Sequence, residues 1–223
     1  MMLATVAEGL ADLLPDMVFV GGAVVELYIP NGVEIAEVRQ TEDVDCVAEI
    51  TSRNDFMELE ERLRKLGFQH EKNVICRWIY KDVIVDVMPT DENILGFSNR
   101  WYREGIAHAI SYHLSDTTVI NMLPVAWFIA CKIEALLRRG ITDLRLSKDL
   151  EDIVFLLNYL ASLEDEIAMV DYQVKKYIQE NFQILLEYDV LPEAIFCVLP
   201  AGENNPQNAK LILQKIQAII NIA

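Results

Sequence analysis

The sequence lacks a long apolar run, because no stretch reaches the roughly 18 residues that a membrane helix needs. Its longest candidates, Leu123–Ile133 and Ile84–Met88, are interrupted or too short. The first residues, Met1–Leu14, carry Glu8 and Asp12 and have no basic start, so they do not resemble a secretion signal. They are predicted instead to form an amphipathic helix of the fold. We therefore expect a cytoplasmic protein with no membrane partner.

Cysteine is scarce, and its spacing excludes a structural zinc. The sequence has four cysteines, no CxxC pair and no histidine at ligand spacing from one. Each lies in an apolar run, which predicts buried free thiols in a reducing cytosol. These residues are Cys46, Cys76, Cys131 and Cys197.

Basic residues are also scarce, with 19 lysines and arginines against 35 acidic residues and a net charge of −16. Such a charge argues against indiscriminate nucleic-acid binding, so we expect no DNA partner. The segment from Arg100 to Lys148 differs, since it has seven basic and four acidic residues, a local balance of +3. A basic zone on an acidic protein is compatible with a specific polyphosphate or RNA end.

The 223 residues, 52% of them hydrophobic, are enough for a core in one domain or two small ones. The first half alternates β-rich runs with helical patterns. The predicted strands are 17–20, 44–50, 74–80 and 83–88, with a hairpin turn at Lys81-Asp82 and helices at 23–29 and 55–66.

The second half changes to an all-helical pattern after an extended segment at 117–123. Helices are predicted at 125–139, 147–160 with Ser147 as N-cap, 164–186, 192–199 and 206–220. We therefore expect an α/β (α+β) core with a mixed sheet over residues 1–118, and an all-α domain over residues 119–223.

Three acidic residues stand where strands are expected. Asp43 and Asp45 are two apart, so in a strand they share a face about 7 Å apart. Asp86 interrupts the apolar run Val83–Met88, where an unpaired carboxylate is costly. Together the three could form an all-oxygen site for a hard divalent cation. The alternatives are an edge strand with a solvated face, and pairing of Asp86 with Arg77 or Lys72.

Gly21-Gly22 follows the first predicted strand and precedes a helix. A glycine turn in this place presents bare backbone N–H groups to an anion such as a triphosphate, although paired glycines are usually only a tight turn. Arg39 and Thr41 share the parity of the DxD carboxylates and line the same face if the segment is extended. A phosphate cradle beside paired carboxylates is what metal-assisted nucleotidyl transfer requires.

The predicted helix 125–139 carries Lys132 and Arg139 on one face, two turns apart. A cation on an inner face suits phosphate neutralisation, and a surface lysine is the equal alternative. Lys148 and Asp149 begin the next predicted helix, where their charges are alternatively a solvated first turn.

These blocks resemble a known family. Gly21-Gly22, Arg39-x-Thr41-x-Asp43-x-Asp45 and Val85-Asp86-Val87 resemble the polymerase-beta-like nucleotidyltransferase superfamily. The second half is similar to its AbiEii/AbiGii toxin branch, in which a Lys-x-x-Ala helix ending in arginine precedes a Lys-Asp-x-x-Asp helix. The matching residues are Lys132, Ala135, Arg138 or Arg139, Lys148, Asp149 and Asp152. The resemblance runs from about residue 17 to residue 160.

The resemblance implies roles for these residues. Asp43 and Asp45 would hold Mg²⁺ (or Mn²⁺) and the triphosphate of an NTP, and Asp86 would complete the metal set and help deprotonate the acceptor. Nucleotide or phosphate binding is expected of Gly21, Gly22, Arg39, Thr41, Lys132, Arg139, Lys148 and Asp149. The helical domain would close the nucleotide cleft. Many members have Gly-Ser where this chain has Gly22-Ala23, so phosphate binding must rest on backbone amides.

The first hypothesis is an enzyme that moves NMP from an NTP to an acceptor hydroxyl, the 3′ end of a tRNA, as the toxin of a toxin–antitoxin or abortive-infection system with an antitoxin protein as partner. The net charge of −16 favours a variant in which a protein or small molecule is the acceptor. The other hypotheses are a non-catalytic nucleotide-binding module and an acidic structural partner that binds no nucleotide.

Overall fold

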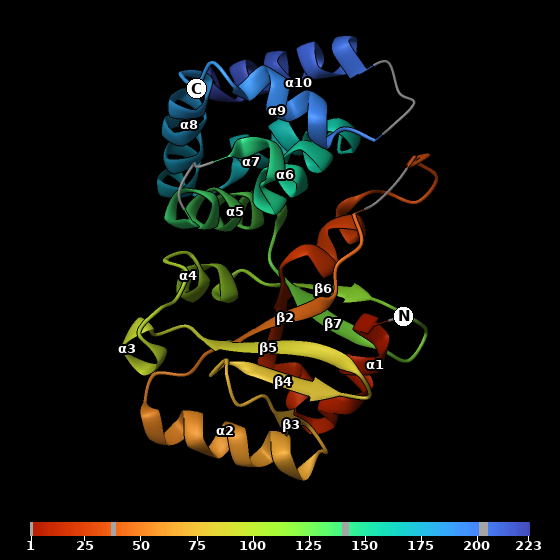
Figure 1. The fold of residues 1–223 in the computed structure, drawn as a ribbon, viewed down its shortest axis with the longest axis vertical. Coiled ribbons are helices and arrows are strands. Elements are labelled where there is room, and N and C mark those ends of the chain that lie inside the picture. The colour runs from red at the N-terminus through yellow and green to blue at the C-terminus, as the bar shows by residue number, and fades with distance from the viewer. Residues whose placement is uncertain (1, 37–38, 140–142, 201–204) are drawn as a thin grey trace. The chain divides into compact units, whose positions relative to one another are not determined.

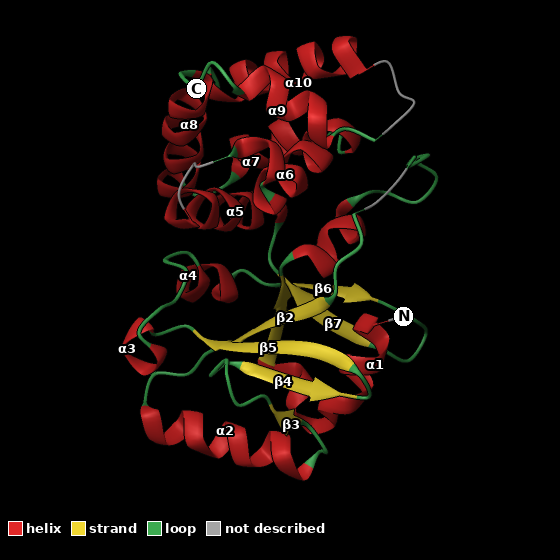
Figure 2. Ribbon diagram, in the orientation of Figure 1, coloured by secondary structure: helices red, strands yellow, loops and turns green. Residues whose placement is uncertain are grey.

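The chain forms two compact units in a computed structural model that describes residues 2–36, 39–139, 143–200 and 205–223 (Figure 1). Unit 1 comprises Met1–Val24 and Arg39–Pro124, and unit 2 comprises Val25–Val38 and Val125–Ala223. Figure 2 shows that unit 1 contains the sheet and that unit 2 is helical. Among the described residues, no helix is both long and apolar enough to cross a bilayer.

The described part of unit 1 contains a seven-stranded mixed sheet, which confirms the expected fold class. Its order is β3-β4-β5-β2-β1-β7-β6. The pairs β2–β5 and β1–β7 are parallel, and the others are antiparallel. The strands are β1 Met17–Val20, β2 Asp43–Ala48, β3 Gln69–His70, β4 Arg77–Tyr80, β5 Val83–Pro89, β6 Ile110–His113 and β7 Val119–Met122.

Strands β2 and β5 bury one face in the core of unit 1. Val44, Cys46, Val85 and Val87 are at most 1% exposed. Helix α1 (Met2–Leu10) packs against both strands. Because side chains alternate along a strand, the polar residues between these apolar ones lie on the opposite face. The core therefore determines which way the acidic residues point.

The other helices of unit 1 are short or lie at its edge. They are η1 Ala11–Asp16, α2 Arg53–Lys65, α3 Glu92–Leu95 and α4 Tyr102–Ala107. The helix expected over Met1–Leu14 ends at Leu10, since Ala11 has a φ of 48° that an α-helix cannot contain. Helix α2 begins before the predicted Asp55 because the Ser52 hydroxyl caps it, accepting a 3.2 Å hydrogen bond from the Asp55 N–H.

The units do not divide at the expected boundary between residues 118 and 119. Strand β7 belongs to unit 1, where it pairs with β1. The segment Val25–Val38 belongs to unit 2. Within unit 2 the Tyr28 ring lies 5.1 Å from that of Phe128, and the Ala36 N–H donates to the Tyr159 hydroxyl at 3.3 Å. A boundary drawn by composition misses both, because the chain enters unit 2 twice.

Unit 2 is built from helices, as the second half of the sequence predicts. They are α5 Val125–Arg139, η3 Leu144–Leu146, α6 Lys148–Tyr159, α7 Leu163–Met169, α8 Tyr172–Leu186, α9 Leu191–Val198 and α10 Asn205–Ile220, with η2 Gly22–Tyr28 ending in this unit. Helix α5 packs against α6, α7 and α8. The single helix expected over 164–186 is wrong, because Val170 adopts extended backbone and separates α7 from α8.

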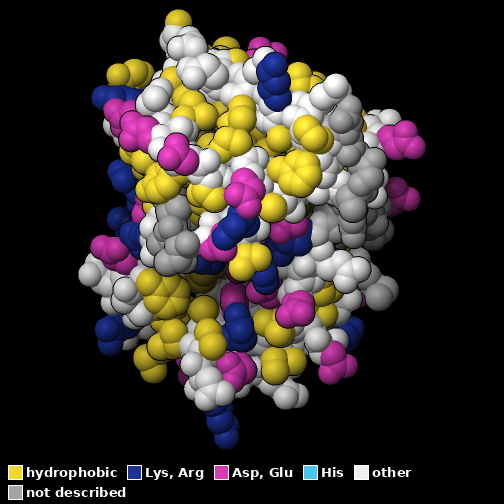
Figure 3. Space-filling view, turned by 45° about the horizontal axis from the view of Figure 1, so that its top comes forward, with side chains coloured by type: hydrophobic (Ala, Val, Ile, Leu, Met, Phe, Trp, Pro, Cys, Tyr) yellow, Lys and Arg dark blue, Asp and Glu magenta, His cyan; other side chains and the backbone are white. Residues whose placement is uncertain are grey.

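Unit 2 also carries exposed apolar side chains. Figure 3 shows hydrophobic side chains gathered on the face of this unit turned toward the viewer. The exposed large ones in unit 2 include Leu146, Met169, Tyr172, Ile184, Phe196 and Leu211. Cys197 is exposed, contrary to the expectation of four buried thiols, whereas Cys46, Cys76 and Cys131 are buried. Cys197 lies on α9, whose core face is formed by Leu191, Ala194 and Ile195.

The predicted hairpin joins β4 and β5 through Lys81 and Asp82, which have φ values of 46° and 66°. Two consecutive positive φ values define the type I′ turn, in which glycine is preferred at the second position. We expect Asp82→Gly to stabilise the protein by about 0.5 kcal/mol. Thermal unfolding measures this. The charge-matched control is Asp116→Gly in the β6–β7 loop, where φ is not positive, and it is expected to destabilise.

Candidate active site

The three predicted carboxylates lie on one face of the sheet of unit 1. In the parallel register of β2 and β5, Asp45 pairs with Asp86, and Asp43 lies two residues before Asp45. Registered partners and residues two apart point to the same side, so the three side chains share that face. Asp86 is buried, and Asp43 and Asp45 are half-buried. The sheet thus gathers three acidic groups where water is partly excluded.

Arg77 of β4 holds the third carboxylate. Arg77 Nε donates to Asp86 Oδ1 at 2.9 Å and Nη2 donates to Oδ2 at 2.8 Å, a bidentate pair. This hydrogen bonding, aided by the charges of Asp86 and Asp43, raises the pKa of Arg77 above its ordinary value against the opposing effect of burial. Of the two partners that the sequence suggested for Asp86, the structure selects Arg77, because the antiparallel register of β4 and β5 places it directly opposite.

Gly21 lies against the DxD carboxylates. Its φ is +75°, and a Cβ built on it would collide with Asp45 Oδ2. Any other residue would therefore strain the backbone and displace the Asp45 carboxylate. The glycine is needed for the turn and for the close approach of Asp45.

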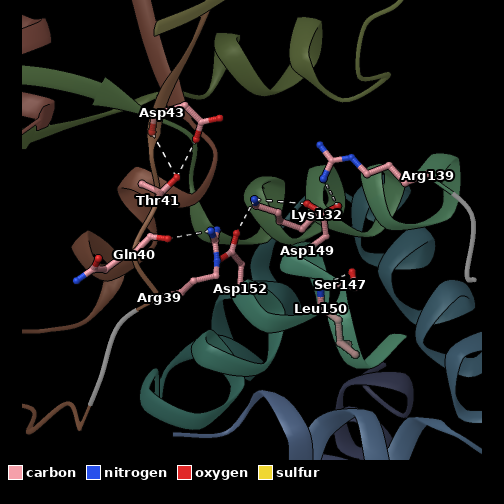
Figure 4. A network of polar contacts seen from close by, with 10 residues as sticks. All are labelled: Arg39, Gln40, Thr41, Asp43, Lys132, Arg139, Ser147, Asp149, Leu150 and Asp152. Carbon is pink, nitrogen blue, oxygen red and sulfur yellow. Dashed lines mark hydrogen bonds and ion pairs between the residues drawn. The ribbon is translucent and has the colours of Figure 1, made fainter. Parts of the chain in front are cut away.

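Gly22 opens η2, as the sequence predicts for the glycine pair. A Cβ on Gly22 would collide with Arg39 Nη2 and lie 3.5 Å from Thr41 Oγ1. Thr41 Oγ1 in turn donates to Asp43 Oδ1 at 2.8 Å (Figure 4). The missing side chain leaves room for a guanidinium, a hydroxyl and bare backbone beside the acids, which is the composition of a phosphate cradle.

The acidic face affects its neighbours. Burial, followed by the charges of Asp45 and Asp86, raises the pKa of the Cys46 thiol well above its usual value. Burial and the charge of Asp86 raise the pKa of Cys76 to about 11. Both thiols stay protonated at neutral pH and are not nucleophiles. The negative field in which they lie is the one that attracts a cation.

The carboxylates fit a hard divalent cation in part. Asp43 and Asp45 offer carboxylate oxygens, the ligands that Mg²⁺ prefers, and Gly21 allows the Asp45 carboxylate to lie against the turn. In residues 2–36, 39–139, 143–200 and 205–223, no group of three or more His, Cys, Asp or Glu side chains is arranged to hold a metal. Both oxygens of Asp86 are bound by Arg77.

A second charged cluster lies within unit 2, between α5 and α6 (Figure 4). Lys132 Nζ is 2.6 Å from Asp152 Oδ2 and 3.6 Å from Asp149 Oδ1, and Arg139 Nη1 is 2.7 Å from Asp149 Oδ2. The Lys132 side chain is 11% exposed, so it lies on an inner face and not at the surface. Two cations and two carboxylates form a charge-balanced cluster in which a buried lysine is paired twice.

Ser147 positions Asp149 in this cluster. The Ser147 hydroxyl accepts a 3.2 Å hydrogen bond from the Leu150 N–H and so fixes the start of α6. Asp149 then lies in the first turn, where the helix dipole stabilises a negative charge. Lys148, by contrast, is exposed, and in the part of the chain that the structure describes no ion pair joins it to Asp149 or Asp152. The predicted site residues of the helical unit are therefore gathered except for Lys148.

Sequence reasoning assigned no site role to Arg77 or Asp152. The sequence offers Arg77 only as an alternative partner of Asp86, because its place opposite that carboxylate depends on the pairing of β4 with β5. Asp152 lies three residues after Asp149, hence on the same face of α6. Its burial at 1% is not visible in the sequence.

Solved structures share the fold of this chain. The chain is similar to the crystal structure of JHP933 from Helicobacter pylori, with 14% identity, a TM-score of 0.53, and coverage of 98% of this chain and 89% of that one. It is also similar to an antigenic nucleotidyltransferase-like protein from Paracoccidioides brasiliensis, with 15% identity, a TM-score of 0.51, and coverage of 87% and 91%. At these identities the likeness shows the fold alone.

The family follows from the sequence. The model of the nucleotidyl transferase AbiEii toxin family, of the type IV toxin–antitoxin systems, matches residues 6–195. This chain belongs to that family, which confirms the resemblance drawn from the motifs. None of the curated protein sequences compared with the chain matches it.

Gly21→Ala tests the approach of the turn to Asp45. We expect a loss of more than about 1 kcal/mol in the free energy of unfolding, since the change adds a collision to the strain of a positive φ. Chemical denaturation measures the loss. Gly96→Ala is the matched control, because Gly96 has a φ of +83° with open space around it and carries the strain alone. Equal losses in the two variants would contradict the role given to Asp45.

Asp152→Asn tests the cluster of unit 2. It leaves the buried Lys132 ammonium with Asp149, at 3.6 Å, as its nearest carboxylate, and we expect a loss of about 3 kcal/mol of unfolding free energy. The same change at Asp143, whose side chain is 35% exposed and pairs with the 44% exposed Arg145, is the control and should have little effect. Urea titrations that gave equally small effects for both would show that the Lys132–Asp152 pair contributes little.

Proposed function

We propose that the chain is a divalent-metal-dependent nucleotidyltransferase that moves NMP from an NTP to an acceptor hydroxyl and releases pyrophosphate. The observation that carries the proposal is the register of β2 and β5, which puts Asp43, Asp45 and Asp86 on one face beside the Gly21-Gly22 turn. The family of the chain supports it.

The proposed site of unit 1 divides its work between two sets of residues. The backbone of Gly21 and Gly22, the Arg39 guanidinium and the Thr41 hydroxyl hold the triphosphate. Asp43 and Asp45 would hold Mg²⁺ or Mn²⁺, which when bound neutralises the phosphates and activates the α-phosphorus. Asp43 and Asp45 are held by β2 and the glycines by a tight turn, so these groups need little reorganisation when substrate binds.

The chemistry is an in-line displacement at the α-phosphorus. The acceptor oxygen forms a bond to that phosphorus, the bond to the bridging oxygen breaks, and pyrophosphate leaves. Asp86 is the proposed group that takes the proton of the acceptor hydroxyl, once its carboxylate is released from Arg77. The protein contributes positioning and charge compensation, with no covalent intermediate on its own residues.

Unit 2 is proposed to close the nucleotide site. Lys132, Arg139 and Lys148 supply positive charge for the phosphates, and Asp149 holds Lys132 and Arg139 in place through its two oxygens. The division into units of similar size, joined where the chain passes between them, suits such a closing part. On this proposal residues 25–38 belong functionally to the helical part.

The proposed acceptor is the 3′ end of a tRNA, and the proposed setting is a toxin–antitoxin system with an antitoxin protein as partner. The family model supports this setting. The local balance of +3 between Arg100 and Lys148 supports an RNA end as acceptor. The net charge of −16 favours the second candidate, a protein or small-molecule acceptor.

The test incubates the full chain with Mg²⁺, total tRNA and each α-labelled NTP in turn. We expect label from one NTP in RNA, and a fall of at least about 10³-fold for Asp43→Asn, because the metal would lose a charged ligand. Asp91→Asn is the matched control, since Asp91 is an aspartate of unit 1 paired with Arg103 and should leave transfer unchanged. Label in protein or a small product, and not in RNA, would select the second acceptor class. Absence of both transfer and metal-dependent NTP binding would overturn the catalytic proposal.

A further inference from the structure

The Arg77 guanidinium binds the Asp86 carboxylate, which the proposed metal site also needs. The guanidinium binds both oxygens of Asp86, at 2.9 and 2.8 Å. A divalent cation takes carboxylate oxygens at about 2.0–2.6 Å and repels a guanidinium at the same atoms. The two cations therefore compete for Asp86, and one must leave before the other binds.

The position of Arg77 allows this exchange. The Arg77 side chain is 30% exposed, whereas that of Asp86 is 12% exposed. The Arg77 backbone is fixed separately, since its N–H donates to the Val74 carbonyl at 3.0 Å and its carbonyl accepts from Glu71 at 2.9 Å. The guanidinium can thus turn out into water while the strand stays paired, and the less exposed Asp86 stays where it is.

The charges on this face explain why such a cation is needed. Three carboxylates that share one face of a sheet repel one another strongly unless positive charge lies among them. Arg77 supplies that charge through its two hydrogen bonds to Asp86, which lies on the same face as Asp43. An arginine keeps its charge at every physiological pH, so this compensation is permanent until another cation replaces it.

We propose that Arg77 is a positioning residue that locks Asp86 while the metal is absent, and that a divalent cation binds the Asp43–Asp45–Asp86 face by displacing the Arg77 guanidinium. This deepens the proposed function and rests on its metal site. Arg77 would set how much metal is needed to assemble the site. It would also leave Asp86 blocked at low metal concentration, so that metal and nucleotide arrive before the proton acceptor is free.

The experiment measures Mn²⁺ affinity of the metal-free full chain by calorimetry and by the electron paramagnetic resonance of free Mn²⁺. We expect Arg77→Gln to tighten Mn²⁺ binding about fivefold, the scale of one partly exposed ion pair. Arg77→Lys keeps the charge but loses the bidentate contact with Asp86, so its Mn²⁺ affinity should lie between those of the unmodified protein and Arg77→Gln. Arg103→Gln breaks another arginine–aspartate pair of unit 1, at 3.0 Å from Asp91, and should leave Mn²⁺ affinity unchanged.

Asp86→Asn completes a double-mutant cycle. If Arg77 acts through Asp86, Arg77→Gln has no further effect on Mn²⁺ affinity in the Asp86→Asn background. A purely structural role for Arg77 would lower unfolding stability without tightening Mn²⁺ binding, so affinity distinguishes the two. Circular dichroism checks that each variant is folded, and Arg77→Lys decides the matter if Arg77→Gln does not fold.

The proposal is overturned if the folded Arg77 variants bind Mn²⁺ no more tightly than the unmodified protein does. It is also overturned if both the unmodified protein and the Arg77 variants fail to bind Mn²⁺ at millimolar concentration. Its outcome is separate from that of the transfer assay. Transfer of NMP together with unchanged Mn²⁺ affinity in Arg77→Gln would refute the locking role of Arg77 and support the proposed enzyme activity. Tighter Mn²⁺ binding in a protein that transfers no nucleotide would support the locking role and refute the enzyme activity.

Discussion

The parallel pairing of β2 with β5 is the constraint on which the rest of the site depends. It brings Asp45 beside Asp86, an arrangement that charge repulsion alone would oppose. The apolar residues that alternate with the acids supply the opposing force, because Val44 and Val85 are completely buried on the other face. Because side chains alternate, a strand that buries these apolar residues on one face presents the acidic residues on the other face. Hydrophobic burial behind the sheet thus holds the acidic face together.

Both units compensate their acidic residues with their own cations. In unit 1 Arg77 binds Asp86, and in unit 2 Lys132 and Arg139 bind Asp149 and Asp152. The net charge of −16 is therefore a poor guide to the charge at either cluster. On the proposals made above, a metal or a phosphate binds by taking the place of such an internal partner. This exchange raises the ligand concentration at which the site is half occupied, compared with an open cluster of acids.

Much of the fold was predictable because periodicity and capping act locally. Strand β1 and helix α5 have the predicted bounds, and Ser147 caps α6 as expected. Short strands with no buried side chain, such as β3 and β6, gave no signal, because their formation depends on pairing with other strands. For the site, spacing within β2 predicted that Asp43 and Asp45 share a face. The Arg77–Asp86 pair and the burial of Asp152 depend on which strands and helices meet, and no single segment contains that information.

Exposure separates Lys132 from Arg139, two of the three cations of unit 2 proposed to act on the phosphates. The Lys132 side chain is 11% exposed and bound by two carboxylates, whereas that of Arg139 is 70% exposed and bound by one. Moving Lys132 onto a phosphate would leave Asp152 buried and unpaired, which is costly. Moving Arg139 would leave Asp149 still near Lys132. In the proposed function Arg139 is therefore the cation that moves onto the phosphate, and Lys132 contributes its charge from its place between Asp149 and Asp152.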